Sequence, residues 1–314
     1  MYPAADCSAR KDCMLPGRGG MRLDYREFKE ELARLVREEL GENVRVHFEM
    51  LPKNNGVKVE GMVFSQAGSP ASPVMYVEEY YHLWEKGVPM EQLVEKMAWN
   101  YERYRDRIQL DPRILDDYEA VKDQIFFKLI HYEKNRKLLE EVPHRRILDL
   151  ALVFYYRLEY RGERATLLIR RQNLSRWGIT AGRLEEQAME ITPQKLPPRL
   201  MTMADLLGMP QEMPGEGGLI RLPMYVITNS DRNLGAGTIL YPKFLKKNTE
   251  MLGEEFFILP SSIHECILVP GWTGYRQETL AKMVKEINRD HVDPREVLSD
   301  RVYCYRKSSD GIFL

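Results

Sequence analysis

The stretch ILDLALVFYYRLEY, residues 147–160, begins with the most apolar part of the chain, ILDLALVFYY (147–156), and decides the fold class. Its length predicts a central β-strand, and RGERA (161–165) is expected to turn the chain into a second strand, ATLLIR (165–170). A short link containing glycine between two apolar runs is typical of a β-hairpin. The run is much shorter than the roughly 20 apolar residues that span a bilayer, and Asp149 interrupts it. We therefore expect a sheet built around this strand.

Residues 21–142, upstream of this strand, predict an N-terminal unit made of a helix, a hairpin and further helices. Apolar residues recur at helical spacing between Asp24 and Gly41. Two alternating runs then flank KNNG (53–56), whose Asn and Gly tolerate the positive φ of a hairpin turn. Residues 74–141 are predicted to form a run of helices, the third of which spans roughly 112–141.

Residues 143–314 predict a C-terminal unit with a mixed or antiparallel sheet and helices packed on it. Helices and strands alternate irregularly along it, so the fold class is α+β. The boundary is expected near Pro143, or else the two halves share one core. The expected elements are helices in 171–193, a long Pro-, Gly- and Met-rich connector in 193–222, a strand in 224–229, two strands joined near 260–262, a helix in 276–291 and a closing hairpin around 308–311.

The overall composition excludes several classes of protein. The 46 basic and 47 acidic residues give a formal net charge of -1, so no global charge attracts nucleic acid or an anionic membrane. The N-terminus lacks the apolar core of a signal peptide, which favours a cytoplasmic location without membrane attachment. Residues 1–20 lack periodicity, and we expect them to be a disordered extension that precedes a natural start at Met21.

The four cysteines do not predict a metal site or a disulfide framework. No CxxC pair or zinc-ligand spacing occurs, so we expect no metal and no other cofactor. In a reducing cytoplasm the thiols are expected to stay free. The cysteines are Cys7, Cys13, Cys266 and Cys304.

Several motifs spread along the chain bring a known family to mind. They are KNNGVKVEGMVF (53–64), SPVMYVEEYYHLWEKG (72–87), KLIHYEKNRKLLEEVPHRRILDLALVFYY (128–156), NLSRWGIT (173–180), MYVITNSDRNLGAGTILYP (224–242), EFFILPSSIHECILVP (255–270) and VDPREVLSDRVYCY (292–305). Together they resemble a bacterial family of unknown function, domain-of-unknown-function family 5688. The resemblance implies a soluble bacterial protein, and it implies no activity and no catalytic residue.

The segment LPSSIHECILVP (259–270) holds the first candidate catalytic residues: Ser261, Ser262, His264 and Glu265. A serine hydrolase needs a nucleophile, a base and an orienting acid within hydrogen-bond reach. On a regular strand His264 and Glu265 would point to opposite faces, so the acid would come from elsewhere, such as Asp149 or Asp231. The alternative is structural, because Pro and Ser are typical turn residues whose hydroxyls bond local backbone groups.

Asp149 is a candidate in its own right because it interrupts an apolar run. Such a carboxylate is expected to face solvent or to find a partner such as Arg145 or Arg146, since an unpaired buried charge is costly. If the neighbouring strands bring His264 close, the two could share a site.

The loop TNSDRNLGAG (228–237) is a candidate ligand site through Asn229, Asp231 and Asn233. Its two glycines could expose backbone N–H groups to an anion. The spacing matches neither a P-loop nor a dinucleotide fingerprint. The competing interpretation is a polar hairpin loop, since Asn, Asp and Gly are the usual turn residues.

A group of arginines between residues 157 and 183 is a candidate nucleic-acid surface, with Arg170, Arg171 and Arg176 as the main candidates. Arginine beside Trp177 suits phosphates and stacked bases. Nearby glutamates dilute the charge, and no known nucleic-acid motif accompanies it. A solvated surface is the competing interpretation.

These observations favour a non-enzymatic binding or regulatory protein with an unknown protein or small-molecule partner. The first alternative is a hydrolase-like enzyme that uses His264, Glu265 and a serine, with Asp149 or Asn229 assisting. The second alternative is nucleic-acid binding through the arginines. The sequence does not identify a substrate, a partner or an oligomeric state.

Overall fold

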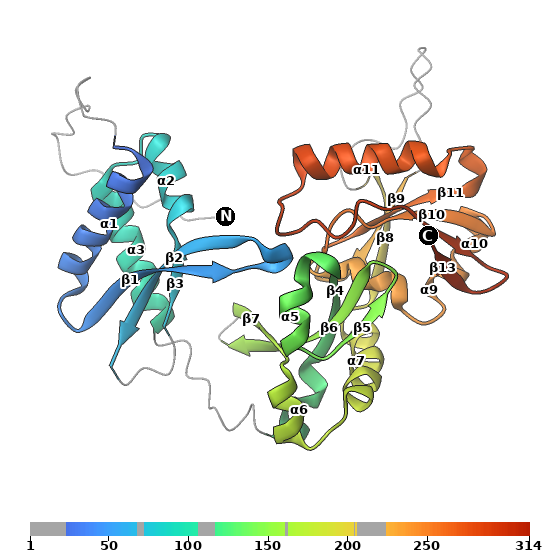
Figure 1. Ribbon diagram of the computed structural model, residues 1–314, viewed down its shortest axis with the longest axis horizontal. Helices are drawn as coiled ribbons and strands as arrows, with labels where there is room; N and C mark the ends of the chain where they lie inside the picture. Colours follow the sequence, from blue (N-terminus) through green and yellow to red (C-terminus); the bar gives the residue numbers. More distant parts are fainter. Residues whose placement is uncertain (1–22, 68–71, 106–116, 161–162, 204, 206–223) are drawn as a thin grey trace, which may run out of the picture. The chain divides into compact units, whose positions relative to one another are not determined.

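The computed structural model describes residues 23–67, 72–105, 117–160, 163–203, 205 and 224–314. The expected extension, residues 1–20, and the expected start at Met21 lie outside them. Helices and antiparallel sheets both contribute, so the predicted α+β class is confirmed. The chain divides into two compact units (Figure 1). Unit 1 is Met1–Glu49 with Glu60–Asp106, and unit 2 is Met50–Val59 with Arg107–Leu314.

Unit 1 packs helices against a small sheet. Its first helix begins with a capping box in which Asp24 and Glu27 bond each other's backbone N–H groups. Phe28, Leu32 and Val36 form its fully buried face. The sheet order is β1-β2-β3. The elements are α1 (Tyr25–Leu40), β1 (Val44–Pro52), β2 (Lys58–Gln66), β3 (Val74–Tyr76), α2 (Val77–Glu85) and α3 (Met90–Arg105).

Unit 2 contains a four-stranded sheet around β6 (Leu150–Tyr160). β6 pairs antiparallel with β4 (Ile125–His131), with β5 (His144–Ile147) and, at its far end, with β7 (Glu163–Leu168). The short elements before and between these strands are α4 (Tyr118–Val121), η3 (Lys122–Gln124), η4 (Glu133–Asn135) and α5 (Arg136–Glu141).

The prediction of a helix through residues 112–141 is wrong where β4 lies. Ile125, Phe127 and Leu129 face one core cluster, and Phe126 and Ile130 face two others, so both faces of β4 are buried. Such a strand reads as a continuous apolar run, which periodicity alone does not distinguish from a buried helix. Because β4 pairs with β6, the expected boundary near Pro143 differs from the division of the chain at Asp106 and Arg107.

A second sheet of unit 2 has the order β13-β12-β10-β11-β9-β8, and the pairings described along it are antiparallel. α11 (Gln277–His291) lies across it (Figure 1), with Leu280 and Val284 packed on Leu259 and Val269. The strands are β8 (Pro198–Thr202), β9 (Tyr225–Asn229), β10 (Glu255–Leu259), β11 (Cys266–Pro270), β12 (Tyr303–Arg306) and β13 (Gly311–Phe313).

Two details of this region refine the sequence prediction. β8 lies within the expected connector 193–222, where it pairs with β9, and residues 206–223 lie outside the described part of the chain. Cys266 and Cys304 are free thiols, as expected. The remaining elements are α6 (Arg171–Trp177), α7 (Ala181–Lys195), η5 (Gly235–Leu240), α9 (Phe244–Lys247), α10 (Thr249–Leu252) and η6 (Gly271–Thr273).

Lys128 interrupts the apolar face of β4 between Phe126 and Ile130, opposite Val153 of β6. Its ammonium group has no hydrogen-bond or ion-pair partner among the described residues. Desolvation by burial lowers the pKa of its ammonium group. Replacement by methionine, which fills a similar volume without charge, is expected to raise the free energy of unfolding at pH 7 by about 1–3 kcal/mol.

The pH dependence of this effect follows from proton binding. Since the pKa of Lys128 is lower in the folded chain than its ordinary 10.5, the unfolded chain binds more protons between the two values. The stability contribution of Lys128 therefore rises with pH in that interval, and the advantage of Lys128→Met shrinks toward pH 10.5. Urea unfolding at a series of pH values measures this difference. A difference that does not depend on pH would contradict the burial of this charge.

Candidate functional site

Asp149 lies in the tight turn between β5 and β6, not inside a strand as the sequence predicted. Ile147 pairs with Leu150, so residues 148 and 149 alone reverse the chain. Leu148 takes a left-handed φ of 56°, which is uncommon for a non-glycine residue. The Arg146 guanidinium donates to the Leu148 carbonyl across this turn, at 3.1 Å. The turn directs the Asp149 side chain away from the β5–β6 ladder.

The Asp149 carboxylate accepts a hydrogen bond at each oxygen. The Tyr303 hydroxyl donates to Oδ1 at 2.6 Å, and the Ser299 hydroxyl donates to Oδ2 at 2.7 Å. Ser299 Oγ in turn accepts from the Arg301 backbone N–H at 2.9 Å. Burial and the nearby Asp149 carboxylate raise the pKa of the Tyr303 phenol well above its ordinary value, so the phenol stays a donor. Ser299 and Tyr303 themselves are almost fully buried.

Neither arginine that the sequence offered as a partner pairs with Asp149 in the structure. Arg145 forms an ion pair with Glu185 at 2.6 Å, and Arg146 lies 3.7 Å from Glu133. Both belong to β5 and are exposed. The partners of Asp149 instead come from residues 299–303, about 150 positions later in the chain.

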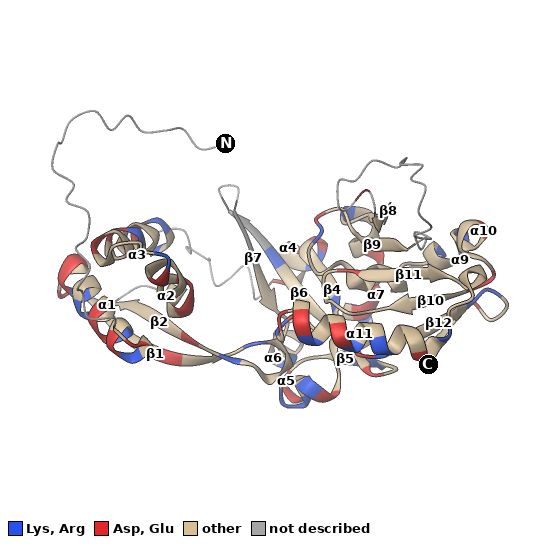
Figure 2. Cartoon of the chain, turned by 90° about the horizontal axis from the view of Figure 1, so that it is seen from above, with Lys and Arg blue, Asp and Glu red and all other residues tan. Residues whose placement is uncertain are grey.

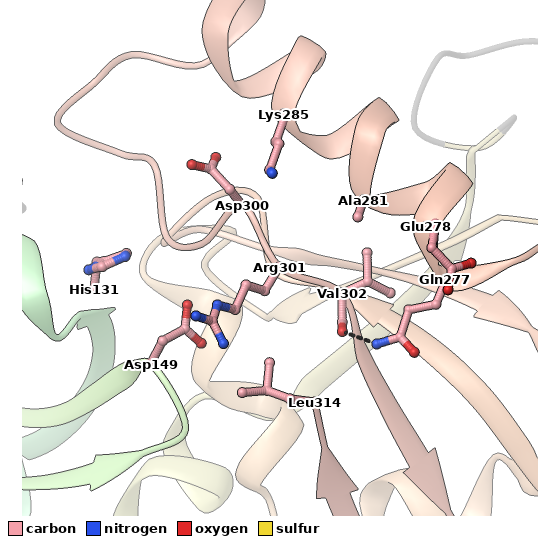
Figure 3. Close-up of a pocket in the computed structure, with 10 residues that line it drawn as sticks. All are labelled: His131, Asp149, Gln277, Glu278, Ala281, Lys285, Asp300, Arg301, Val302 and Leu314. Atoms are coloured by element: carbon pink, nitrogen blue, oxygen red, sulfur yellow. Dashed lines mark hydrogen bonds between the residues drawn. The ribbon is translucent and has the colours of Figure 1, made fainter.

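Asp149 opens onto a pocket with a cavity volume of about 490 Å³ (Figure 3). One side consists of His131 at the end of β4 together with Asp149. The other side comes from α11, from the chain that leads into β12, and from the C-terminal residue. The lining residues are His131, Asp149, Gln277, Glu278, Ala281, Lys285, Asp300, Arg301, Val302 and Leu314.

The charged side chains of this pocket are not paired with one another. Among the described residues, neither Arg301 nor Lys285 has an ion-pair partner. Asp300 accepts one hydrogen bond at Oδ1, from the Asn288 amide at 2.8 Å. Figure 3 shows Lys285 reaching toward Asp300. Opposite charges therefore line the pocket and are available to a ligand.

His131 adds a hydrogen-bond donor to the pocket. Its Nδ1 accepts from the Lys134 backbone N–H at 3.2 Å, so the proton of the neutral ring lies on Nε2. Burial and the nearby Lys134 charge lower the pKa of His131, although Asp149, Asp300 and Glu133 act in the opposite direction. The ring is therefore mainly neutral at pH 7.

The segment that holds Ser261, Ser262, His264 and Glu265 is a loop rather than a strand. β10 ends at Leu259 and β11 begins at Cys266, so strand alternation does not apply between them. The Ser262 hydroxyl accepts from the His264 backbone N–H at 3.1 Å, as expected of turn chemistry. Ser261 is buried, and its carbonyl accepts from Leu298 N–H at 2.9 Å.

The His264 ring bonds groups other than the predicted ones. Nδ1 accepts from the Leu234 backbone N–H at 3.2 Å, and Nε2 lies 3.5 Å from a carboxylate oxygen of Glu296. The described bonds of His264 and of Asp149 involve different residues. Glu296 was not among the predicted site residues, because no motif connects it with His264.

The predicted ligand loop at residues 228–237 is closed by its own side chains. Asn229 Oδ1 accepts from the N–H groups of Asp231 and Asn233, and Asn229 Nδ2 donates to the Asn233 carbonyl. Asp231 forms an ion pair with Arg157 at 2.8 Å. The Gly235 N–H donates to the His264 carbonyl at 3.0 Å. These bonds hold the loop against the chain around His264.

The candidate nucleic-acid arginines make mostly internal bonds. Arg170 pairs with Glu141, and Arg171 donates to the Glu140 carbonyl at 3.1 Å. Arg157 is largely buried and lies over the Phe126 ring, with 4.8 Å from Cζ to the ring centroid. Arg176 is exposed on α6. In Figure 2 acidic residues lie among the basic ones along α11, so this helix carries no uniformly basic face.

Two further kinds of site are absent from the part of the chain that the structure describes. No cluster there brings together three or more His, Cys, Asp or Glu side chains that could hold a metal ion. In the same residues, no helix combines the length and the apolar character needed to cross a membrane.

The fold and the pocket define an α+β protein with a charged pocket next to a hydroxyl-bonded aspartate. The chain belongs to a family of unknown function, DUF5688, whose model matches residues 25–307. This match confirms the resemblance found in the sequence. No curated protein and no solved structure matches the chain.

Proposed function

We propose that this protein binds a small zwitterionic ligand, an aliphatic amino acid or a short peptide, in the pocket beside Asp149, and that it acts without catalysing a reaction. One observation carries the proposal: opposite charges line a single pocket without forming ion pairs with each other. The anionic group of a zwitterionic ligand would pair with the cationic residues of the pocket, and its cationic group would pair with the anionic residues.

The chemistry of the lining groups supports this ligand class. Arg301 and Lys285 suit a carboxylate, since arginine presents a planar pair of N–H donors. Asp300 and Glu278 suit an ammonium group. Ala281, Val302 and Leu314 lie between the charges in Figure 3 and offer apolar contact to an aliphatic side chain. The cavity volume of about 490 Å³ lies within the usual range for small-molecule pockets.

A binding role has more support than hydrolysis. The hydroxyls of Ser299 and Tyr303 both donate to Asp149, and the Ser262 hydroxyl accepts from a backbone N–H. No described hydrogen bond joins one of these hydroxyls to a histidine ring that could act as its base. The nucleic-acid alternative has little support, because Arg170 bonds Glu141, Arg171 bonds the Glu140 carbonyl and Arg157 bonds Asp231.

Titration calorimetry with leucine and its two single-charge analogues tests the ligand class. L-leucine is expected to bind, whereas 4-methylpentanoate lacks its ammonium and isopentylamine lacks its carboxylate. Each analogue is expected to bind at least about ten-fold more weakly, since a charge-assisted hydrogen bond contributes about 1.5–3 kcal/mol. The dipeptide Leu-Leu extends the series. Equal affinities for leucine and 4-methylpentanoate would contradict the proposal, because the pocket would then recognise only the carboxylate.

Two charge-neutral variants test the residues. Arg301→Gln and Lys285→Gln are each expected to weaken binding of L-leucine about ten-fold. Lys282→Gln is the matched control, because Lys282 is an exposed lysine of α11 that does not line the pocket. An equal loss in Lys282→Gln would mean that general surface charge, rather than this pocket, attracts the ligand.

A further inference from the structure

The turn of the β1–β2 hairpin belongs to unit 2, where Asn55 makes an unusual number of side-chain bonds. Its Nδ2 donates to the carbonyls of Pro294 and Val297, at 2.9 and 2.7 Å. Its Oδ1 accepts from Asn135 Nδ2 at 3.0 Å, and its backbone N–H donates to Asn135 Oδ1 at 2.8 Å. The neighbouring Asn54 donates to the Arg295 carbonyl at 2.7 Å.

One set of these partners holds His131. Asn135 is buried, and its Nδ2 also donates to the His131 carbonyl at 2.8 Å. Lys134, the residue before Asn135, donates its backbone N–H to His131 Nδ1. The Asn55–Asn135 pair therefore fixes η4, which in turn fixes both the backbone and the ring of His131.

The other set leads into the opposite wall of the pocket. The carbonyls of Pro294, Arg295 and Val297 accept from Asn54 or Asn55. This segment continues directly into residues 299–301. The N–H groups of Leu298 and Ser299 donate to the carbonyls of Ser261 and Pro260. This segment is thus held on one side by the end of β10 and on the other by the hairpin turn.

We propose that Asn55 is a positioning residue for the pocket: its amide bridges the segment that holds His131 and the segment that carries Asp300 and Arg301, and so sets the spacing of the two walls. The inference rests on the proposed function for its effect on ligand binding. Turn geometry alone does not call for these bonds, because glycine would satisfy the φ of 61° at Asn55 equally well.

Glycine at position 55 is therefore a suitable test variant. Asn55→Gly keeps the positive φ and removes the three side-chain bonds. Asn55→Asp keeps an acceptor for Asn135 and loses the donor to Pro294 and Val297, so it separates one wall from the other. Asn248→Ala is the matched control, since it removes a comparable bond from an amide to a carbonyl, with Phe244 as the acceptor, at residues that do not line the pocket.

Two measurements on the full chain need no ligand. NMR titration follows the His131 ring, assigned with His131→Gln, and hydrogen exchange follows the amides of residues 298–301. In Asn55→Gly the pKa of His131 is expected to rise by about half a unit as desolvation decreases, and the amides to exchange about ten-fold faster. Asn55→Asp should show the faster exchange, and Asn248→Ala neither change.

A third measurement is the affinity for L-leucine, which is expected to fall about five-fold in Asn55→Gly. If the His131 titration and the exchange of residues 298–301 stay as in the wild type, Asn55 does not position the pocket. If both change while the wild-type protein binds no leucine, the positioning role stands and the proposed ligand is wrong. The two proposals therefore fail separately.

Discussion

Replacement of Asp149 by alanine is expected to lower the free energy of unfolding by about 3–5 kcal/mol. The variant leaves the buried hydroxyls of Ser299 and Tyr303 without their acceptor. A buried donor without a partner costs about 1–3 kcal/mol, and two are affected at once. Urea unfolding followed by circular dichroism measures the loss.

Two milder variants calibrate this result. Tyr303→Phe removes one donor and leaves Asp149 bonded to Ser299, so a loss of about 1–2 kcal/mol is expected. Asp149→Asn keeps one acceptor oxygen, and its loss should lie between those of Tyr303→Phe and Asp149→Ala. If Asp149→Ala unfolds at the same urea concentration as the wild type, the three groups do not act as a buried network.

Replacement of Gly235 by alanine is expected to destabilise the chain by more than about 3 kcal/mol or to prevent folding. A Cβ atom at this position would overlap Thr228 Oγ1 and lie 2.6 Å from the Asn229 nitrogen and 2.7 Å from the His264 carbonyl oxygen. Two of these atoms belong to the backbone, so relief requires two segments to move apart. The yield of soluble protein and the melting temperature report the effect.

Gly182 provides the matched control for this substitution. A Cβ atom there would have Thr180 Oγ1 as its nearest neighbour, at an ordinary 3.8 Å. Because Gly182 lies in α7, alanine is expected to raise stability by about 0.5–1 kcal/mol. If both substitutions destabilise the chain to a similar extent, the close contacts at Gly235 are not the reason that alanine destabilises the chain there.

Local signals in the sequence were sufficient for much of the fold. The turn KNNG, with Asn55 and Gly56 at positive φ, joins β1 and β2, and SSDG joins β12 and β13. β6 is the central strand of its sheet, as its length indicated. β4 was missed because burial on both faces removes the alternation that marks a strand, and β8 because it pairs only with a strand some 25 residues later.

The pocket was predictable only in part. Asp149 is a charge within an apolar run, and this signal identifies the residue but not its partners. Arg301, Lys285 and Asp300 are ordinary surface charges in the sequence, and His131 ends an apolar stretch without any motif. What makes them neighbours is tertiary packing between segments about 150 residues apart, for which a single sequence offers no periodic signal.

The contacts of Asn54 with Arg295 also affect how the chain is made. These residues are 241 positions apart, so at synthesis rates of roughly 5–20 residues per second the Arg295 carbonyl is made about 10–50 s after Asn54. During that interval the nascent polypeptide exposes its amide groups on the ribosome. The pocket is therefore completed only after residues 299–314 have been synthesised, and a product truncated before them would lack it.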